Sequence, residues 1–348
     1  MENLLKVVKV IKEEEKTITR KFMNEESKDL DELLRMLSEV SVEILVEDEL
    51  RSIMRKIRNE NERIYVYIGF EPSNVLHLGA LVASEPLIKL AQYGVRIKFL
   101  LADVHAWLNG KGELEELRSL AERNERLLKG LCNARGIDLS LVEFVYGSDY
   151  QFKEDYVKLV LQLSKFVTAA KARKSMDMIS KKDYAYRVSS EIYALMQVID
   201  IGYLNVRIAV GGLDQRKIHV LAREYLEKCG YDKPVAIHTP IILGLDGKSK
   251  MSKSLENTIL LTDDEPSIQQ KIWNAFCPEG QVQNNPLIDI VKYVVFPWKG
   301  HLEIENRRFE VFHEFENAWI RKEIPASKLK EAIIIEVNEI LNRISTNL

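Results

Sequence analysis

The feature that most constrains the fold of this chain is an alternation of short β-rich runs with long helical stretches. The runs are RIYVYIGF (63–70), RIKFLLAD (96–103), VEFVYG (142–147) and VRIAVGG (206–212), and one of the helical stretches is Glu113–Arg135. Such alternation predicts an α/β fold, in which a mostly parallel sheet is covered by helices on both faces. Ligands of such sheets bind beyond the carboxyl ends of the strands, so the polar residues after each run are the first candidates for a site.

Two flanking regions differ from this central pattern. Residues 1–60 are rich in Glu, Lys, Leu and Met at helical spacing, which predicts a helical N-terminal extension. After about Thr262 the β-rich runs stop. The helical runs that follow are Pro266–Ala275, Glu310–Arg321 and Lys328–Ile344. The sequence therefore predicts an extension (1–60), a sheet domain (61–261) and a small helical domain (262–348).

Composition excludes several classes of protein. A chain of 348 residues with 46% hydrophobic content can bury a large core. Its cysteines, Cys132, Cys229 and Cys277, are odd in number and too far apart for paired zinc ligands, so we expect no disulfide framework, no protein-bound metal and a reducing compartment. The first apolar run is short and broken by lysines, which predicts a cytoplasmic protein without a membrane span. The net charge of -3 means that any nucleic acid must be bound by local basic patches.

The first motif, YIGFEPSNVLHLGA (67–80), passes from a strand through a polar turn into a helix. A helix N-terminus presents unpaired amides and a positive dipole to phosphate. Gly79 permits close approach of an adenine ring, and His77 can donate a hydrogen bond to developing phosphoryl charge. Taken alone, such a pair is more often a histidine near a helix cap.

The second motif, GKSKMSKS (247–254), is a glycine-flanked basic loop. Flexible lysines in it can close over a triphosphate and neutralise charge in the transition state. The alternative is a solvated basic loop. His77 lies well upstream, on a turn from strand to helix, and this order and spacing resemble those of class I aminoacyl-tRNA synthetases, a resemblance that favours the nucleotide site.

The third and fourth motifs supply polar groups and glycines. Tyr193, Gln197 and Asp200 share one face of a predicted helix, so one wall carries three polar groups, although such a face can also be buried and satisfied by backbone. The segment AVGGLDQRKIH (209–219) runs from a strand through a glycine turn into a helix. Its paired glycines let the backbone approach a ligand closely.

Together these motifs resemble those of class I aminoacyl-tRNA synthetases, and in particular the tyrosyl-tRNA synthetases of the archaeal and eukaryotic cytoplasmic type, over roughly 48–348. The first resembles the HIGH signature, the second contains the KMSKS pentad unbroken, the third looks like the YxxxQxxD helix and the fourth like the GGxDQ segment. The resemblance implies a Rossmann-type catalytic domain and a helical anticodon-binding domain. It also implies a ligase that activates L-tyrosine with ATP and Mg²⁺ and transfers it to the 3′ end of tRNA(Tyr).

The resemblance also implies roles for individual residues. His77, Lys250 and Lys253 are the implied catalytic residues. The residues implied to bind ATP are Gly69, His77, Gly79, Gly212, Asp214, Lys250, Met251, Ser252, Lys253 and Ser254. The residues implied to bind tyrosine are Tyr67, Leu101, Ala102, Tyr193, Gln197, Asp200 and Gln215. In this scheme Asp200 and Tyr67 bracket the phenolic hydroxyl, while Tyr193, Gln197 and Gln215 hold the amino group.

Several assignments stay open at this point. Asp103 and His105, which follow a strand, either contact the ligand or order their loop. The region of about 104–188 corresponds to the family's insertion, which implies a homodimer interface. Its basic cluster of Lys165, Lys171, Arg173 and Lys174 is also typical of a solvated helix face.

For tRNA the candidates are Arg216, Lys217, Phe309 and Lys328. Arg216 and Lys217 are equally typical of a solvated basic pair, and an aromatic residue such as Phe309 is more often part of a core. The family's anticodon-reading aspartate is missing, because Ser327 and Lys328 stand where it should be. This departure predicts weaker or differently arranged reading of the first anticodon base.

Two further departures bear on rival functions. Asn74 stands where many members carry glycine, and Ala80 replaces the second histidine of the HIGH signature. A nonenzymatic RNA-binding relative therefore stays open, although the unbroken KMSKS argues against it. Tryptophanyl-tRNA synthetases share the architecture, but an indole offers no hydroxyl for Tyr67 and Asp200 to bracket.

Overall fold

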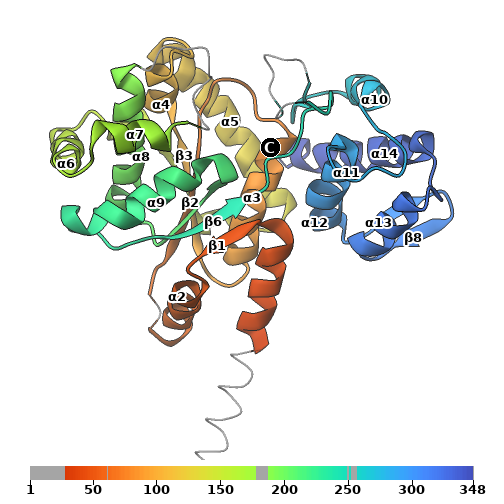
Figure 1. Cartoon of the computed structure of the whole chain (residues 1–348), viewed down its shortest axis with the longest axis horizontal. Coiled ribbons are helices and arrows are strands. Elements are labelled where there is room, and N and C mark those ends of the chain that lie inside the picture. The colour runs from red at the N-terminus through yellow and green to blue at the C-terminus, as the bar shows by residue number, and fades with distance from the viewer. Residues whose placement is uncertain (1–27, 61, 178–186, 249–250, 252–256, 348) are drawn as a thin grey trace, which may run out of the picture.

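The computed structural model describes residues 28–60, 62–177, 187–248, 251 and 257–347. Its centre is a six-stranded sheet with the strand order β1-β6-β5-β2-β3-β4 (Figure 1). The strands are β1 (Glu43–Leu45), β2 (Tyr65–Phe70), β3 (Arg96–Leu101), β4 (Val142–Tyr146), β5 (Ile208–Gly212) and β6 (Val235–Thr239). All neighbours in the sheet are parallel except β1, which is antiparallel to β6. The predicted α/β fold with a mostly parallel sheet is confirmed.

Side chains on the two faces of the sheet pack into two separate cores. On β2, Val66 and Ile68 point into one core and Tyr67 into the other, as strand geometry requires. The first core is covered by α3 (Leu78–Ala91) and α5 (Leu114–Ala134), and the second by α8 (Val188–Tyr203) and α9 (Arg216–Tyr225), so that the sheet lies between two helical layers (Figure 1).

The N-terminal extension contributes a strand as well as helices. Residues 28–40 are helical, β1 follows, and α2 (Glu47–Glu60) comes before β2. The expectation of a helical extension is therefore corrected in one respect: the extension also contains β1, which forms an edge of the central sheet by pairing with β6. A strand of three residues carries too little alternation to be visible in a sequence.

The insertion between β3 and α8 is mostly helical. Its elements are α4 (Asp103–Leu108), α5, η1 (Leu139–Leu141), β4, η2 (Gly147–Asp149), α6 (Glu154–Ser164) and α7 (Ala169–Ser175). Two further short helices, η3 (Leu213–Gln215) and η4 (Leu226–Cys229), precede and follow α9. One strand of the central sheet, β4, lies within the insertion, so the insertion is part of the sheet domain and not an appendage.

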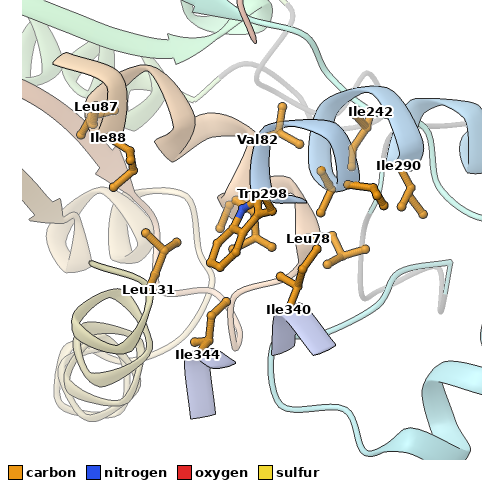
Figure 2. Packing of buried hydrophobic residues seen from close by; sticks show 14 of the residues in the cluster. Leu78, Val82, Leu87, Ile88, Leu131, Ile242, Ile290, Trp298, Ile340 and Ile344 are labelled. Carbon is orange, nitrogen blue, oxygen red and sulfur yellow. The ribbon is translucent and has the colours of Figure 1, made fainter. Parts of the chain in front are cut away.

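The C-terminal part is predominantly helical, as the sequence predicts. Its elements are α10 (Glu265–Asn274), α11 (Pro286–Ile290), η6 (Val291–Val295), α12 (Phe296–Lys299), β7 (Leu302–Ile304), β8 (Arg307–Phe309), α13 (Phe312–Ile320) and α14 (Ala326–Ser345). Figure 2 shows how it joins the sheet: Trp298, with Ile340 and Ile344 of α14, packs against Leu78 and Val82 of α3. The helical part thus shares one continuous hydrophobic core with the α3 side of the sheet.

No helix among the described residues combines the length and the apolar character that crossing a bilayer requires.

Candidate active site

A cleft of about 540 Å³ opens at the carboxyl ends of β2, β3 and β5, where the fold predicts a ligand. A smaller hollow of about 270 Å³ adjoins it and shares His77, Gly212, Asp214 and Met251 as lining residues. Helix α8 contributes Tyr193, Gln197 and Asp200 to the wall of the larger cleft, and this confirms that the three residues share one helix face. The structure therefore gathers the four sequence motifs around one site, to the extent that their residues are described.

Asp200 lies at the closed end of the cleft, completely buried in a network of donors. Its Oδ1 accepts hydrogen bonds from the Tyr150 hydroxyl (2.6 Å), the Tyr156 hydroxyl (2.7 Å) and Gln151 Nε2 (2.8 Å). Its Oδ2 has no hydrogen-bond partner among the described residues, although His105 Nε2 lies 3.5 Å away. The carboxylate thus has one saturated oxygen and one oxygen available to a ligand.

The three phenols around Asp200 are held in the protonated form. Burial, followed by the nearby Asp200 carboxylate, raises the pKa of Tyr67, Tyr150 and Tyr156. Protonated hydroxyls can donate hydrogen bonds to a carboxylate, and hydrogen bonds to a charged acceptor are stronger than those between neutral groups. The polar groups at the closed end of the cleft are therefore held in place by one another.

Sequence reasoning missed Tyr150, Gln151 and Tyr156. Tyr150 and Gln151 come shortly after β4, so the rule that ligands bind beyond strand ends would have pointed to them. Tyr156 lies in the first turn of α6 and gives no such signal.

Amide and hydroxyl groups surround the middle of the cleft. Gln197 Nε2 donates to Gln215 Oε1 (3.0 Å), and the Tyr193 hydroxyl donates to Glu71 Oε1 (2.7 Å), which also accepts from Asn109 Nδ2 (2.9 Å). Gln197 Oε1 is buried without a partner in the part of the chain that the structure describes. A buried acceptor of this kind costs free energy unless a donor reaches it, and a substrate ammonium is such a donor.

One predicted pocket residue lies elsewhere. Leu101 is buried in the core on the α3 side of the sheet, while Leu100, Ala102 and Tyr67 line the cleft. The assignment of Leu101 to the pocket is therefore wrong, and Leu100 takes its place. Alternate residues of a strand point to opposite faces, so an assignment displaced by one residue reverses the face.

His77 caps the N-terminus of α3 and faces both hollows. Its Nδ1 accepts a hydrogen bond from the Gly79 amide (3.0 Å), so in the neutral ring the proton is on Nε2. A Cβ on Gly79 would lie 2.6 Å from His77 Cε1, so glycine is needed here for the imidazole itself. The neutral His77 ring therefore carries an N–H group beside the amides of a helix N-terminus.

The glycine turn after β5 is also shaped by its own side chains. A Cβ on Gly211 would lie 3.0 Å from Gln215, and one on Gly212 would lie 2.7 Å from Asp214 Oδ1. Gly69, Gly212, Asp214 and Gln215 line the cleft, as does the buried Met251. The other residues predicted from the second motif, Lys250, Ser252, Lys253 and Ser254, lie outside the described residues.

Comparison with known proteins identifies the family. The model of the family "tRNA synthetases class I (W and Y)" matches residues 58–342. The chain belongs to this family.

Similar proteins within this family are named as tyrosine–tRNA ligases. Tyrosine–tRNA ligase of Methanopyrus kandleri is 40% identical over 320 residues, which cover 90% of this chain and 96% of that protein. Tyrosine–tRNA ligase of Archaeoglobus fulgidus is 43% identical over 277 residues, or 80% of this chain and 83% of that protein. The crystal structure of tyrosyl-tRNA synthetase from Archaeoglobus fulgidus, complexed with L-tyrosine, superposes with a TM-score of 0.84 at 39% identity and covers 91% of this chain and 99% of that chain. These relatives support the resemblance found in the motifs.

The structure separates the roles of Asp103 and His105, which the sequence left open. Asp103 accepts from Ser148 through the backbone amide (2.9 Å) and the hydroxyl (2.5 Å), so it orders the loop after β4. His105 instead lines the cleft and packs edge-on against Tyr193 with 4.5 Å between ring centroids.

Among the tRNA candidates, the three cations make ion pairs on the surface. Arg216 pairs with Glu43, Lys217 with Asp177 and Lys328 with Glu331. In the basic cluster of the insertion, Lys171 pairs with Glu224 and Arg173 with Glu191.

The expected stacking role of Phe309 is corrected by its burial. Its ring is 1% exposed and packs edge-on against Phe315 with 5.8 Å between centroids. A buried core ring presents no face on which a nucleobase could stack.

Proposed function

We propose that the chain is a tyrosine–tRNA ligase that activates L-tyrosine with ATP and passes the tyrosyl group to tRNA(Tyr) in the cytoplasm. The observation that carries this proposal is the Asp200 carboxylate in the wall of the cleft, whose Oδ1 accepts from three donors while Oδ2 has no hydrogen-bond partner among the described residues. A phenolic hydroxyl would donate to Oδ2 and accept from the protonated hydroxyl of Tyr67.

This arrangement selects tyrosine over its closest analogues. Phenylalanine would leave a buried charged acceptor unpaired, and tyrosyl-tRNA synthetases are themselves the usual example of such discrimination. Tryptophan would place a larger indole at the closed end, where its N–H could not also accept from Tyr67. Leu100 and Ala102 line the cleft beside the ring.

The amino group lies further out in the proposed complex. The ammonium donates to Gln197 Oε1 and to the oxygens of Tyr193 and Gln215, which surround the middle of the cleft. These contacts place the substrate carboxylate toward His77. Positioning of this kind is the main source of catalysis in phosphoryl and nucleotidyl transfer.

In the first step, a carboxylate oxygen of tyrosine forms a bond to the α-phosphorus, and the bond from that phosphorus to the bridging oxygen of pyrophosphate breaks. The nucleophile is already ionised, so the enzyme needs no general base for this step. The Nε2–H of His77 and the amides at the start of α3 stabilise the charge on the phosphoryl oxygens. We assign the same role to Lys250 and Lys253, and the ribose hydroxyls to Asp214. In the second step, a hydroxyl of the terminal ribose of tRNA attacks the tyrosyl carbonyl and AMP leaves.

We assign magnesium to the nucleotide. Mg²⁺ prefers phosphate oxygens with a few carboxylates and waters over an all-protein cage. No group of three or more His, Cys, Asp or Glu side chains within the described ranges is arranged to hold a metal. When bound, the ion would neutralise charge on the triphosphate.

We also propose a homodimer formed through the insertion. Exposed apolar side chains gather on it: Trp107, Phe152, Val157, Leu161 and Phe166. Trp107 and Phe152 contact each other edge-on with 6.4 Å between ring centroids. Apolar surface of this kind is typical of subunit interfaces. Light scattering after gel filtration should report a dimer for the native chain and a monomer for Leu161→Glu, while a native monomer at micromolar concentration would contradict the interface.

The helical C-terminal part is the proposed anticodon-binding region. Ser327 and Lys328 occupy the positions where the family's anticodon-reading aspartate is expected, and the Lys328 ammonium forms an ion pair with Glu331. We therefore propose that the first anticodon base is read differently from the family pattern. Aminoacylation of tRNA(Tyr) altered at that base should fall only mildly, and a severe loss would contradict this.

The decisive experiment for the function is exchange of labelled pyrophosphate into ATP with single amino acids. Tyrosine should support exchange, while tryptophan and phenylalanine should support little. Exchange with tryptophan alone would assign the rival ligase activity, and no exchange with any of the three would favour a nonenzymatic RNA-binding protein.

A further inference from the structure

A row of polar residues crosses three strands behind the glycine turn. Glu43 of β1 is the direct cross-strand partner of His238 on β6, and His238 is in turn the partner of Gly211 on β5. His219 of α9 packs over this row, and a Cβ on Gly211 would lie 3.1 Å from its Cε1. The N-terminal edge strand therefore reaches the turn that carries Asp214 and Gln215.

Hydrogen bonds run along this row in one direction. His238 Nδ1 lies 2.9 Å from Glu43 Oε2, and His219 Nδ1 lies 3.1 Å from His238 Nε2. A carboxylate only accepts, so the proton of His238 is on Nδ1 and its Nε2 accepts from His219. Burial lowers the pKa of His219 to about 3 and also lowers that of His238, so both rings stay neutral and keep these tautomers.

Glu43 also fixes the first residue of α9. Arg216 Nε donates to Glu43 Oε2 (2.7 Å) and a terminal guanidinium nitrogen donates to Oε1 (2.8 Å). Because two parallel hydrogen bonds join the guanidinium of Arg216 to the carboxylate of Glu43, both the distance and the relative orientation of the two groups are fixed. Arg216 directly follows Gln215, whose side chain accepts from Gln197 in the cleft. One carboxylate on the edge strand thus holds both the start of α9 and the imidazole pair beneath the turn.

We propose that Glu43 is a positioning residue for tyrosine activation. It holds the first turn of α9, and with it Asp214 and Gln215, in the place where tyrosyl-adenylate is bound. This inference rests on the proposed ligase function and makes β1 part of the catalytic machinery. It also gives Arg216 a role in the first step of the reaction, which involves no tRNA.

The chain supplies a matched control. Glu49 of α2 makes an equivalent bidentate pair with Arg223, at 2.7 and 2.8 Å, about two turns further along α9. This pair also joins the N-terminal extension to α9. Among the described residues, neither Glu49 nor Arg223 forms a hydrogen bond with His219 or His238. Loss of Glu49 should weaken the packing of the extension without moving the turn.

The test compares Glu43→Gln and Arg216→Gln with Glu49→Gln in tyrosine-dependent pyrophosphate exchange without tRNA. For the first two variants we expect kcat/KM for tyrosine and for ATP to fall about tenfold, because a small misplacement of binding groups lowers the rate. Glu49→Gln should stay within about twofold of the native enzyme at a comparable loss in melting temperature. Nitrogen NMR of the imidazoles should show the tautomer of His238 change in Glu43→Gln only.

Each outcome is distinguishable. Equal kinetics for Glu43→Gln and Glu49→Gln, measured on folded protein, would overturn the proposal. Arg216→Gln keeps the test valid if Glu43→Gln does not fold, because Arg216 is nearly half exposed. Normal exchange with impaired aminoacylation in Arg216→Gln would instead assign Arg216 to tRNA and refute its positioning role. Absence of exchange in the native enzyme would count against the proposed function and not against this inference.

Discussion

The two ends of the cleft are built in different ways. At the hydroxyl end, side chains from separate elements are joined in one network, in which Tyr150, Gln151 and Tyr156 converge on a single oxygen of Asp200. At the nucleotide end, the described contacts come mainly from backbone: the start of α3 with its His77 cap, and the glycine turn after β5. In the proposed function, selection of the amino acid therefore depends on fixed side-chain chemistry, whereas the described groups assigned to phosphate are amides and one imidazole, to which Lys250 and Lys253 are added by proposal.

The difference has a physical reason. A phenolic hydroxyl is a weak and small recognition feature, so it must be met by a desolvated acceptor that is costly to leave unpaired. A triphosphate carries its own large charge and is attracted by any helix N-terminus or cation within reach. The comparison predicts that mutations at the nucleotide end lower the rate, while mutations at the hydroxyl end lower selectivity.

The largest effect is expected at His77. Replacement by alanine removes a donor to the phosphoryl oxygens, so kcat for pyrophosphate exchange should fall about 10²- to 10³-fold with little change in KM for tyrosine. Gly79→Ala should reproduce part of this loss, because its Cβ would displace the imidazole. His313→Ala, at an exposed histidine of α13, is the control. A kcat for His77→Ala within a factor of three of the native value would remove His77 from catalysis.

The next largest effect is expected at Asp200. In Asp200→Asn the charged acceptor is lost, and hydrogen bonds to charged groups contribute about 1.5–3 kcal/mol, so kcat/KM for tyrosine should fall about 10- to 100-fold. The value for phenylalanine should change much less, so the preference for tyrosine shrinks. Steady-state exchange with both amino acids measures this. If the preference were unchanged, the hydroxyl site would have to lie elsewhere.

A smaller effect is expected from removing one donor of the network. Tyr150→Phe leaves Asp200 Oδ1 with two donors, and a loss of about 1 kcal/mol corresponds to an approximately fivefold fall in kcat/KM for tyrosine. Tyr203→Phe is the matched control, because its ring stacks on Tyr150 at 5.2 Å but its hydroxyl donates to Asp155 instead. Equal kinetics for the two variants would show that the network is not needed for selection.

The smallest effect is one on stability, and we expect it from the imidazole pair behind the glycine turn. The pKa of His219 is lowered to about 3 in the folded protein and is near 6.5 in the unfolded chain. Between these values the unfolded chain binds a proton that the folded protein does not bind, so the free energy of unfolding falls as the pH drops from 6.5 toward 3. Between pH 6 and pH 5 the unfolding free energy should fall by about 1 kcal/mol more in the native chain than in His219→Gln.

Urea unfolding at the two pH values measures the difference. His313→Gln should keep the native slope, since His313 is largely exposed. A slope for His219→Gln as steep as that of the native chain would show that this ring is not held neutral.

Much of the fold follows from local patterns in the sequence. The strands β2, β3, β4 and β5 and the longest helices were predicted because alternation and helical spacing are properties of neighbouring residues. β1 and β6 were missed. β1 has three residues, and its partner on β6 lies almost 200 positions away, so only the folded chain shows that they pair.

The sequence was enough to predict the residues to which the chemistry is assigned: His77, the helix face of Tyr193, Gln197 and Asp200, and the glycine turn with Asp214 and Gln215. Only the tertiary structure decided which neighbours hold them. It placed Leu100 instead of Leu101 in the pocket, buried Phe309, brought three donors to Asp200 and set Glu43 against Arg216. The reason is that a residue's type and spacing fix its chemical capacity and its face on an element, whereas burial and hydrogen-bond partners depend on segments far apart in the chain.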